Sequence, residues 1–147
     1  MNDSIVNKLR SDAIIFFKEG IKAATPQNVI PANVFLDEDV FSITDLKGNN
    51  KSFDLKDYNR IIVIGAGKAS TAMAKEIEMI LANRIFEGLV VTKYNFVNEL
   101  KNVKIIEAAH PLPDSNGLKA VRAVINNGCG SLLAQPQKRG DPRKSVW

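Results

Sequence analysis

An apolar run that ends in two closely spaced glycines and a lysine constrains the fold of this chain more than any other feature. The run covers residues 61–64, and Gly65, Gly67 and Lys68 follow within four positions. Four consecutive aliphatic residues are typical of a strand buried on both faces, as in a parallel sheet covered by helices. The glycines allow a sharp turn and a close approach of backbone to ligand. The pattern therefore predicts a buried strand followed by a tight turn.

The segment after this turn has the periodicity of an amphipathic helix over 68–82. Lys75, Glu76 and Glu78 are expected to lie away from its apolar stripe. The N-terminus of a helix favours negative charge, so Lys68 is locally unfavourable there unless an anion lies nearby. The alternative, a ligand-free turn with a lysine that points into solvent, remains open. The stripe itself comprises Ala69, Ala72, Met73, Ile77, Ile80 and Leu81.

Two known phosphate-binding motifs do not fit this turn. The P-loop pattern fails, because Ile62 stands five residues before Gly67 and Ala69 follows the lysine. The dinucleotide pattern has Ser70 in its third glycine position. An acidic residue is also missing after the second strand, where the chain reads Thr92-Lys93-Tyr94. Binding of a nicotinamide cofactor is therefore weakly supported.

A second candidate site follows the third predicted strand. His110-Pro111-Leu112-Pro113-Asp114 comes after a strand near 103–108, at the end where open α/β sheets bind ligands. The two prolines stiffen this loop, and Asp114 or Ser115 is expected to cap the next helix. The alternative is a plain strand-to-helix connection with a structural histidine.

The remaining pattern predicts an α/β fold. Strands near 61–64, 88–92 and 103–108 alternate with helical segments, which is typical of a parallel sheet with right-handed crossovers. Residues 40–43 and 51–55 flank a turn and predict a hairpin. A helix from Ser115 carries Leu118, Val121 and Ile125 on one face. An amphipathic helix over 4–24, whose face must pack on something, carries Ile5, Leu9, Ala13, Phe16, Phe17 and Ile21.

Length and composition favour one soluble domain. The chain has 147 residues, 45% of them hydrophobic, which is enough for a core. It has no apolar stretch of roughly 20 residues and no signal-peptide pattern, so we expect a cytoplasmic protein with no membrane partner. The single Cys129 agrees with a reducing compartment. The net charge of +4 is concentrated in residues 135–147, which argues against a nucleic-acid partner.

Three segments together resemble a known family. Ala24-Thr25-Pro26, Val63-Ile64-Gly65-Ala66-Gly67-Lys68-Ala69 and Glu107-Ala108-Ala109-His110-Pro111-Leu112-Pro113-Asp114 look like the N-terminal domain of the glycerate 2-kinases. These are enzymes of the MOFRL group, also described as hydroxypyruvate reductases. The resemblance covers residues 4 to about 125. It implies a three-layer, Rossmann-like parallel sheet with flanking helices. It also implies phosphoryl transfer from ATP to the 2-hydroxyl of D-glycerate, with Mg²⁺, in a cleft between two domains.

The resemblance also implies roles for individual residues. Lys68 matches the family's active-site lysine and would neutralise charge on the phosphoryl group or on the glycerate carboxylate. No metal ligand is assigned. A sugar-phosphate isomerase-like domain and a non-catalytic phosphate- or nucleotide-binding domain remain as alternatives. The residues that would shape the turn, supply donors or border the crevice are Gly65, Ala66, Gly67, Ser70, His110 and Asp114.

The chain also departs from the family pattern. Family members are much longer, and residues 1–125 correspond to their N-terminal domain. Residues 126–136 resemble a phosphate-holding loop, but the strand expected before it is absent. The tail, 126–147, is atypical and resembles a frameshifted or artificially added end, which we expect to be mobile. We therefore expect a chain that is inactive alone and that exposes apolar surface through which it could form a homodimer.

Overall fold

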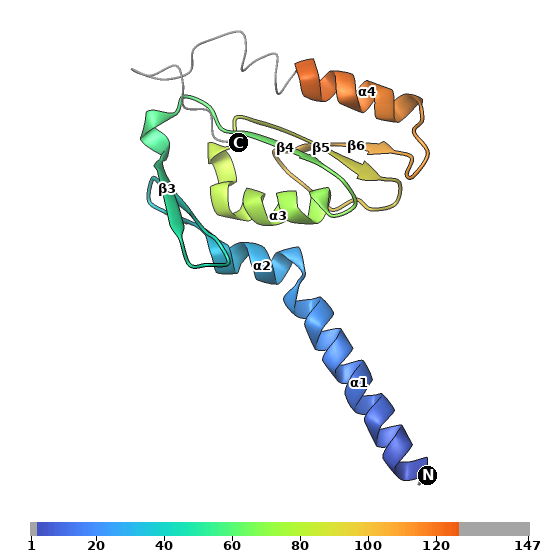
Figure 1. The fold of residues 1–147 in the computed structure, drawn as a ribbon. Helices are drawn as coiled ribbons and strands as arrows, with labels where there is room; N and C mark the ends of the chain where they lie inside the picture. The colour runs from blue at the N-terminus through green and yellow to red at the C-terminus, as the bar shows by residue number, and fades with distance from the viewer. Residues whose placement is uncertain (1–2, 127–147) are drawn as a thin grey trace.

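The computed structural model describes residues 3–126, so all but the first residue of the predicted tail lies outside the described part. The N-terminal half folds as two helices and a small antiparallel sheet, and the C-terminal half as a parallel sheet with two helices (Figure 1). None of the helices in the described part is long and apolar enough to cross a membrane. In chain order the elements are α1 Asp3–Ala23, α2 Pro26–Asn33, β1 Val34–Asp37, β2 Val40–Thr44, β3 Asn50–Asp54, η1 Leu55–Asp57, β4 Ile62–Ala66, α3 Ser70–Leu81, η2 Ala82–Arg84, β5 Glu87–Lys93, β6 Lys104–Ala108 and α4 Ser115–Val124.

The small sheet has the order β1-β2-β3 and is antiparallel throughout. The predicted hairpin is confirmed as β2 and β3. Its turn is closed by the Asp45 carboxylate, which accepts hydrogen bonds from the backbone N–H groups of Lys47 and Asn49 at 2.8 and 2.9 Å. Gly48 adopts a φ of +82° in this turn, a conformation that glycine adopts without strain. The strand β1 and the helix α2 were not predicted.

The second sheet is parallel and has the order β4-β5-β6. Helix α3 contacts β4 and β5, and α4 contacts β6. The two helices lie on opposite faces of the sheet, which gives three layers (Figure 1). The predicted three-layer α/β fold with a parallel sheet is therefore confirmed.

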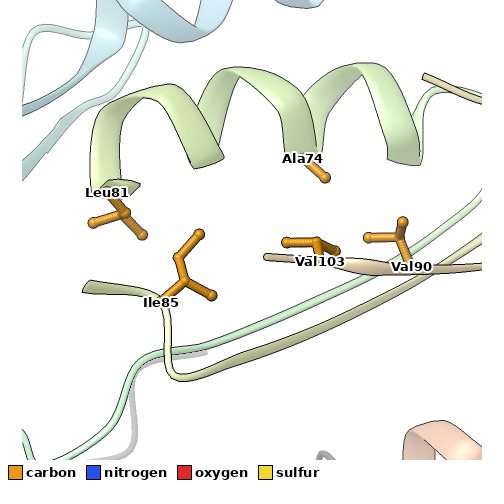
Figure 2. Packing of buried hydrophobic residues seen from close by; sticks show 5 residues of the cluster. All are labelled: Ala74, Leu81, Ile85, Val90 and Val103. Carbon is orange, nitrogen blue, oxygen red and sulfur yellow. The ribbon is translucent and has the colours of Figure 1, made fainter. Parts of the chain in front are cut away.

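The core lies between α3 and the parallel sheet (Figure 2). Ala74 and Leu81 point from α3 toward the side chains of Ile85, Val90 and Val103, and all five are buried. The central strand β5 contributes Val90 to this layer and is the most buried strand of the sheet, because it is paired on both sides. The apolar pattern of the sequence thus gives one continuous core in the C-terminal half.

Two predictions about burial were wrong. Strand β4 was expected to be buried on both faces, but Ile64 is 42% exposed, because β4 is an edge strand and α4 covers β6 instead. On α3, Met73 is 49% exposed, whereas Glu76 and Glu78 are buried. The reason is that α3 contacts α2 as well as the sheet, so its buried surface is wider than one apolar stripe.

Glu78 has a specific structural role. Its carboxylate accepts hydrogen bonds from the backbone N–H groups of Lys101 at 2.8 Å, Val103 at 3.2 Å and Asn102. These residues lead into β6. A side chain that sequence periodicity places in solvent therefore fixes the connection between the second and third parallel strands.

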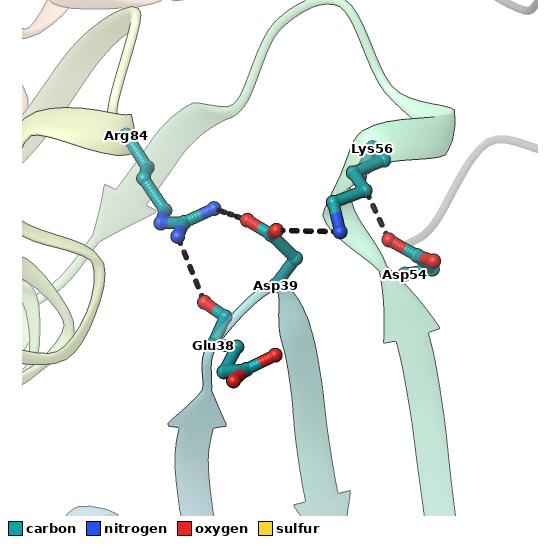
Figure 3. A network of polar contacts seen from close by, with 5 residues as sticks. All are labelled: Glu38, Asp39, Asp54, Lys56 and Arg84. Carbon is teal, nitrogen blue, oxygen red and sulfur yellow. Dashed lines mark hydrogen bonds and ion pairs between the residues drawn. The ribbon is translucent and has the colours of Figure 1, made fainter.

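The two halves of the fold are joined by ion pairs around Asp39 (Figure 3). This carboxylate, in the β1–β2 turn, contacts the Arg84 guanidinium and lies 3.0 Å from the Lys56 ammonium. Arg84 also donates to the Glu38 carbonyl at 2.8 Å, and the Asp54 side chain accepts from the Lys56 backbone N–H. The hydrogen bond from Arg84 is the main cause that lowers the pKa of Asp39, and the bond from Lys56 adds to it. The cluster ties the antiparallel sheet to the segment after α3.

Two predicted apolar faces are uncovered within the described part of the chain. Helix α1 begins and ends one residue before its predicted bounds, has no buried residue and projects from the rest of the molecule (Figure 1). Leu118 and Val121 on α4 and Ile125 directly after it are each 54–56% exposed, and the buried residue of this helix is Ala120. The helices were thus predicted correctly, but no described residue buries the face of α1 that was expected to pack.

Candidate functional site

The carboxyl ends of the three parallel strands bring the two predicted site segments to one edge of the sheet. Ala66 ends β4, Lys93 ends β5 and Ala108 ends β6. Because neighbouring strands lie about 4.8 Å apart, the turn after β4 and the loop after β6 are separated by roughly 10 Å across β5. Open α/β sheets bind ligands at this edge.

The turn between β4 and α3 needs both of its glycines, for different reasons. A Cβ atom on Gly65 would lie 3.2 Å from Val90 Cγ1, so the glycine lets β4 approach β5 closely. Gly67 has a φ of +124°, which other residues rarely adopt. Its backbone N–H donates to the Val91 carbonyl at 2.9 Å, and its own carbonyl accepts from the Ser70 N–H at 3.1 Å. The turn is thereby held against the central strand.

Ser70 and Lys68 play different parts in this turn. The buried Ser70 hydroxyl donates to the Val91 carbonyl at 2.8 Å and so fixes the first residue of α3 on β5. Lys68 is exposed, and its ammonium forms no hydrogen bond or ion pair with any residue between 3 and 126. Ala69 occupies the N-cap position without a side-chain cap, so the first N–H groups of α3 have no acceptor from the helix itself. Because the Ser70 N–H already donates to the Gly67 carbonyl, the group that the turn leaves uncommitted among the described residues is the Lys68 ammonium.

The loop after β5 clamps the start of α3. Thr71, which is 1% exposed, donates to the Phe96 carbonyl at 2.7 Å and accepts from the Asn98 side-chain amide at 3.0 Å. Thr92 donates to the same carbonyl at 3.2 Å. Strand β5 ends in Lys93, whose ammonium lies 5.2 Å from the Phe96 ring centroid. Lys93 thus occupies the position at which dinucleotide-binding domains have an acidic residue that binds the ribose hydroxyls.

The same loop also holds the segment after β6. The Tyr94 hydroxyl donates to Asp114 at 2.6 Å and accepts from the Asn116 side chain at 2.9 Å. The other carboxylate oxygen of Asp114 accepts from the Gly117 N–H at 2.8 Å, so the predicted helix cap is confirmed at Asp114. The hydrogen bond from Tyr94 is the main cause that lowers the pKa of Asp114, with the Gly117 N–H second. The same bond raises the pKa of Tyr94.

His110 lies in the loop between β6 and α4. It is exposed, and its peptide bond to Pro111 is cis. No hydrogen bond between described residues links Lys68 directly to His110 or Asp114. The two predicted segments are instead connected through β5 and its loop, which contacts Thr71 on one side and Asp114 on the other.

Sequence reasoning missed the residues that make this connection. Tyr94, Thr71 and Asn98 belong to no motif, and their hydrogen bonds join residues 20 to 27 positions apart. The only available signal was their place directly after a predicted strand or at a predicted helix start.

The described residues do not form a metal cage of their own. Between residues 3 and 126 there is no group of three or more His, Cys, Asp or Glu side chains that could hold a metal ion. Asp114 is engaged by Tyr94, and the Glu107 carboxylate accepts from the Asn95 N–H at 2.8 Å. A magnesium ion at this edge would need oxygen ligands from phosphates and water, which is its usual coordination in phosphoryl-transfer sites.

A pocket of about 190 Å³ lies near the opposite end of β4, away from these loops. Arg84 in its wall is held by Asp39, and the Arg60 guanidinium lies 4.8 Å from the Phe86 ring centroid. Both cations are thus already engaged. The pocket is lined by Leu55, Tyr58, Asn59, Arg60, Ile61 and Arg84.

Comparison with known proteins shows related sequences and structures. The chain is 34% identical over 125 residues to a glycerate 2-kinase of Pyrococcus horikoshii, which covers 83% of this chain and 26% of that protein. It is 37% identical over 93 residues to a putative hydroxypyruvate reductase of Agrobacterium vitis, covering 52% and 24%. The crystal structure of a glycerate kinase from Thermotoga maritima superposes with a TM-score of 0.59 at 28% identity, covering 82% of this chain and 25% of that one.

A further crystal structure, of a protein from Pyrococcus horikoshii OT3, superposes with a TM-score of 0.67 at 32% identity and covers 86% of this chain and 26% of that one. The chain thus spans about a quarter of the length of these relatives. A family model described as a domain of unknown function, DUF4147, matches residues 12–130. This match extends over most of the sequence and includes both segments at the carboxyl edge. The chain therefore belongs to the DUF4147 family, which it shares with glycerate 2-kinases.

Proposed function

We propose that this chain is part of an ATP-dependent glycerate 2-kinase, a cytoplasmic enzyme that phosphorylates the 2-hydroxyl of D-glycerate. One observation carries the proposal. The turn that holds Lys68 and the loop from His110 to Asp114 lie at the same carboxyl edge of the sheet, and hydrogen bonds of the loop after β5 connect the two segments. The names of the Pyrococcus and Thermotoga relatives support this activity.

The proposed roles follow from the chemistry of each group. The Lys68 ammonium would neutralise negative charge on the transferring phosphoryl group or on the glycerate carboxylate, the kind of stabilisation that phosphoryl transfer requires. The backbone of Gly65, Ala66 and Gly67 would allow close approach of the anion, while Ser70 keeps the turn on β5. The segment bearing His110 and Asp114 would border the substrate on the far side of β5.

ATP would supply the phosphoryl group, and Mg²⁺ would neutralise charge on its phosphates. The described residues offer the metal no complete ligand set, so the proposal assigns none of them to it. Their contribution is to hold anionic oxygens at the sheet edge.

The chain alone is expected to lack kinase turnover. It spans about a quarter of the length of its kinase relatives, and a site open on one side neither excludes water nor positions two substrates. A coupled assay with ATP, Mg²⁺ and D-glycerate should therefore show no turnover above background. Phosphorylation of glycerate by the 147-residue chain would contradict this argument.

The proposal is tested by equilibrium binding to the chain itself. We expect weak, salt-sensitive binding of ATP and inorganic phosphate, because an exposed cation is screened by ions. Lys68→Ala should weaken this binding about 10-fold, as expected for the loss of one charge-assisted contact. Lys75→Ala, which removes an exposed lysine from the helix that follows the turn, serves as the control and should leave the affinity unchanged.

Three results would contradict the assignment. If Lys68→Ala and the parental chain bind ATP equally, Lys68 is a solvent lysine. If Lys75→Ala weakens binding as much as Lys68→Ala, the effect is general electrostatics. Binding of a sugar phosphate with no affinity for ATP would favour the isomerase-like alternative.

A further inference from the structure

Lys93 is a second lysine at the carboxyl edge of the parallel sheet, and it belongs to neither of the two candidate segments. It is the last residue of the central strand β5, so it lies between the turn that holds Lys68 and the loop after β6. In dinucleotide-binding domains the acidic residue at the end of the second strand contacts the bound nucleotide. The position of Lys93 is therefore one from which a side chain reaches a ligand at this edge.

The backbone brings Lys68 and Lys93 to the same end of β5. Ala66, the last residue of β4, is paired with Val91, and each lysine follows this pair by two residues. The Gly67 N–H, directly before Lys68, donates to the Val91 carbonyl at 2.9 Å. Neighbouring strands are about 4.8 Å apart, and each ammonium is carried by a flexible four-carbon stem. The two ammonium groups can therefore reach one small anion between them.

Neither ammonium is neutralised by a carboxylate of the described residues. Lys68 and Lys93 form no ion pair and no side-chain hydrogen bond with any residue between 3 and 126. The Asp114 and Glu107 carboxylates accept instead from neutral hydroxyl and N–H donors at 2.6–2.8 Å. Two cations repel each other, so an anion bound between them is electrostatically favourable.

The surroundings of Lys93 favour phosphate oxygens as its ligand. Its side chain is half-buried, and its ammonium lies 5.2 Å from the Phe96 ring centroid. The ring attracts the charge electrostatically and leaves N–H donors of the ammonium for an oxyanion. An ammonium offers no acceptor to ribose hydroxyls, whereas phosphate oxygens accept hydrogen bonds from it. Lys93 thus suits the charged part of a nucleotide and not its sugar.

We propose that Lys93 and Lys68 together bind the phosphate groups of ATP at this edge. The inference rests on the proposed function, which places ATP there, and it adds Lys93 as a second binding residue. Inorganic phosphate is the sharpest probe, because one small anion responds strongly to both lysines only if it lies close to both. Salt screens more distant charges, so their effect on the affinity is smaller.

The experiment is a titration of the isotope-labelled full chain with inorganic phosphate, followed by heteronuclear NMR. Lys93→Gln removes the charge and keeps most of the stem, so the affinity should fall about 10-fold, as for Lys68→Ala. Lys93→Arg keeps the charge and can stack on Phe96, so it should retain most of the parental affinity. Lys104→Gln is the matched control. Lys104 is exposed and begins β6 at the opposite edge, paired with Leu89, so its loss should leave the affinity unchanged.

The outcomes separate this inference from the proposed function. If Lys68→Ala weakens phosphate binding and Lys93→Gln does not, the proposed role of Lys68 stands and Lys93 lies outside the site. If neither variant changes the affinity, both assignments are wrong. If Lys93→Arg binds as weakly as Lys93→Gln, or if Lys104→Gln weakens binding equally, the effect does not come from a local charge and the inference is overturned.

A measurement on the parental chain tests the inference without any substitution. Phosphate should shift the side-chain ammonium signals of both Lys68 and Lys93, and leave that of Lys104 in place. A shift of the Lys68 signal alone would overturn the inference, even if a Lys93 variant failed to fold.

Discussion

Gly88 lies in the central strand at a point where the neighbouring strand leaves no room for a side chain. A Cβ atom there would lie 2.6 Å from Val103 Cγ2, well inside contact distance. The branched Val103 is itself part of the core, so it cannot move without disturbing Ala74 and Leu81. The glycine is thus required for packing.

Gly88→Ala should therefore destabilise the fold by about 1–3 kcal/mol, the usual cost of overpacking a core. Gly20→Ala is the control, because nothing lies within 4 Å of that position on α1. It should be neutral or stabilise α1 by up to about 1 kcal/mol. Chemical denaturation followed by circular dichroism measures both. Equal stability of the Gly88 variant and the parental chain would show that β5 and β6 can separate locally.

The contact between Tyr94 and Asp114 has a consequence that depends on pH. Its hydrogen bond is the main cause of the lowered pKa of Asp114. A group whose pKa is lower in the folded state stabilises the fold above its unfolded pKa, near 4 for aspartate. This contribution is lost as the pH falls through the folded pKa.

Tyr94→Phe should consequently raise the pKa of Asp114 toward its ordinary value and move the loss of stability to higher pH. Carbon-detected NMR titration of the side-chain carboxylates measures this directly. Asp45 provides an internal control, because Asn49 rather than Tyr94 lowers its pKa. An unchanged titration of Asp114 in the variant would mean that the Gly117 N–H alone holds the carboxylate.

Among the secondary-structure elements, those with a strong sequence period were predicted well. Helix α1 was expected over 4–24 and spans Asp3–Ala23, and β4, β5 and β6 lie within two residues of their expected positions. Helix α2 was missed because it has eight residues with Pro31 inside, a residue that usually ends a helix. Strand β1 was missed because four residues carry little periodicity.

The candidate site was likewise predicted only where the sequence carries a clear pattern. The turn at 65–70 and the loop at 110–114 were found because each follows an apolar strand, and topology alone brings such segments together. The contacts of Tyr94, Thr71 and Asn98 could not be found, because they depend on side-chain positions across the sheet. The exposure of the α4 face was not predictable either, since periodicity identifies an apolar face but not its cover.

Glu78 shows how an element can be fixed by a residue of unexpected type. Replacing it by alanine leaves the N–H groups of Lys101, Asn102 and Val103 without their acceptor. We expect a loss of roughly 2–3 kcal/mol, since unsatisfied buried donors are costly. Glu99→Ala, which removes an exposed carboxylate from the same connection, should change stability little. Thermal unfolding compares the two variants, and similar melting temperatures would contradict the role of Glu78.

At the scale of the described residues, the fold consists of two sheets joined by packing on α3 and by ion pairs. Helix α2 and strand β1 contact α3, and the ion pairs of Asp39 link the antiparallel sheet to the segment after α3. The antiparallel sheet adds no buried residue to the core between α3 and the parallel sheet, although its half-buried Phe41 packs against that core. We therefore expect the two sheets to open separately, as weakly coupled units do.

Asp39→Asn tests this coupling, because it removes the charge that holds both Arg84 and Lys56 (Figure 3). Amide hydrogen exchange should accelerate in residues 34–54, while β5 and β6 exchange at the parental rate. The effect should be strongest near neutral pH. The lowered pKa of Asp39 means that its ion pairs are formed above about pH 4 and are lost as the pH falls through the folded pKa.

Asp37→Asn removes an exposed carboxylate from the same sheet and serves as the control. If exchange accelerates in β5 and β6 as well, the two sheets unfold together and the ion pairs belong to a single cooperative unit.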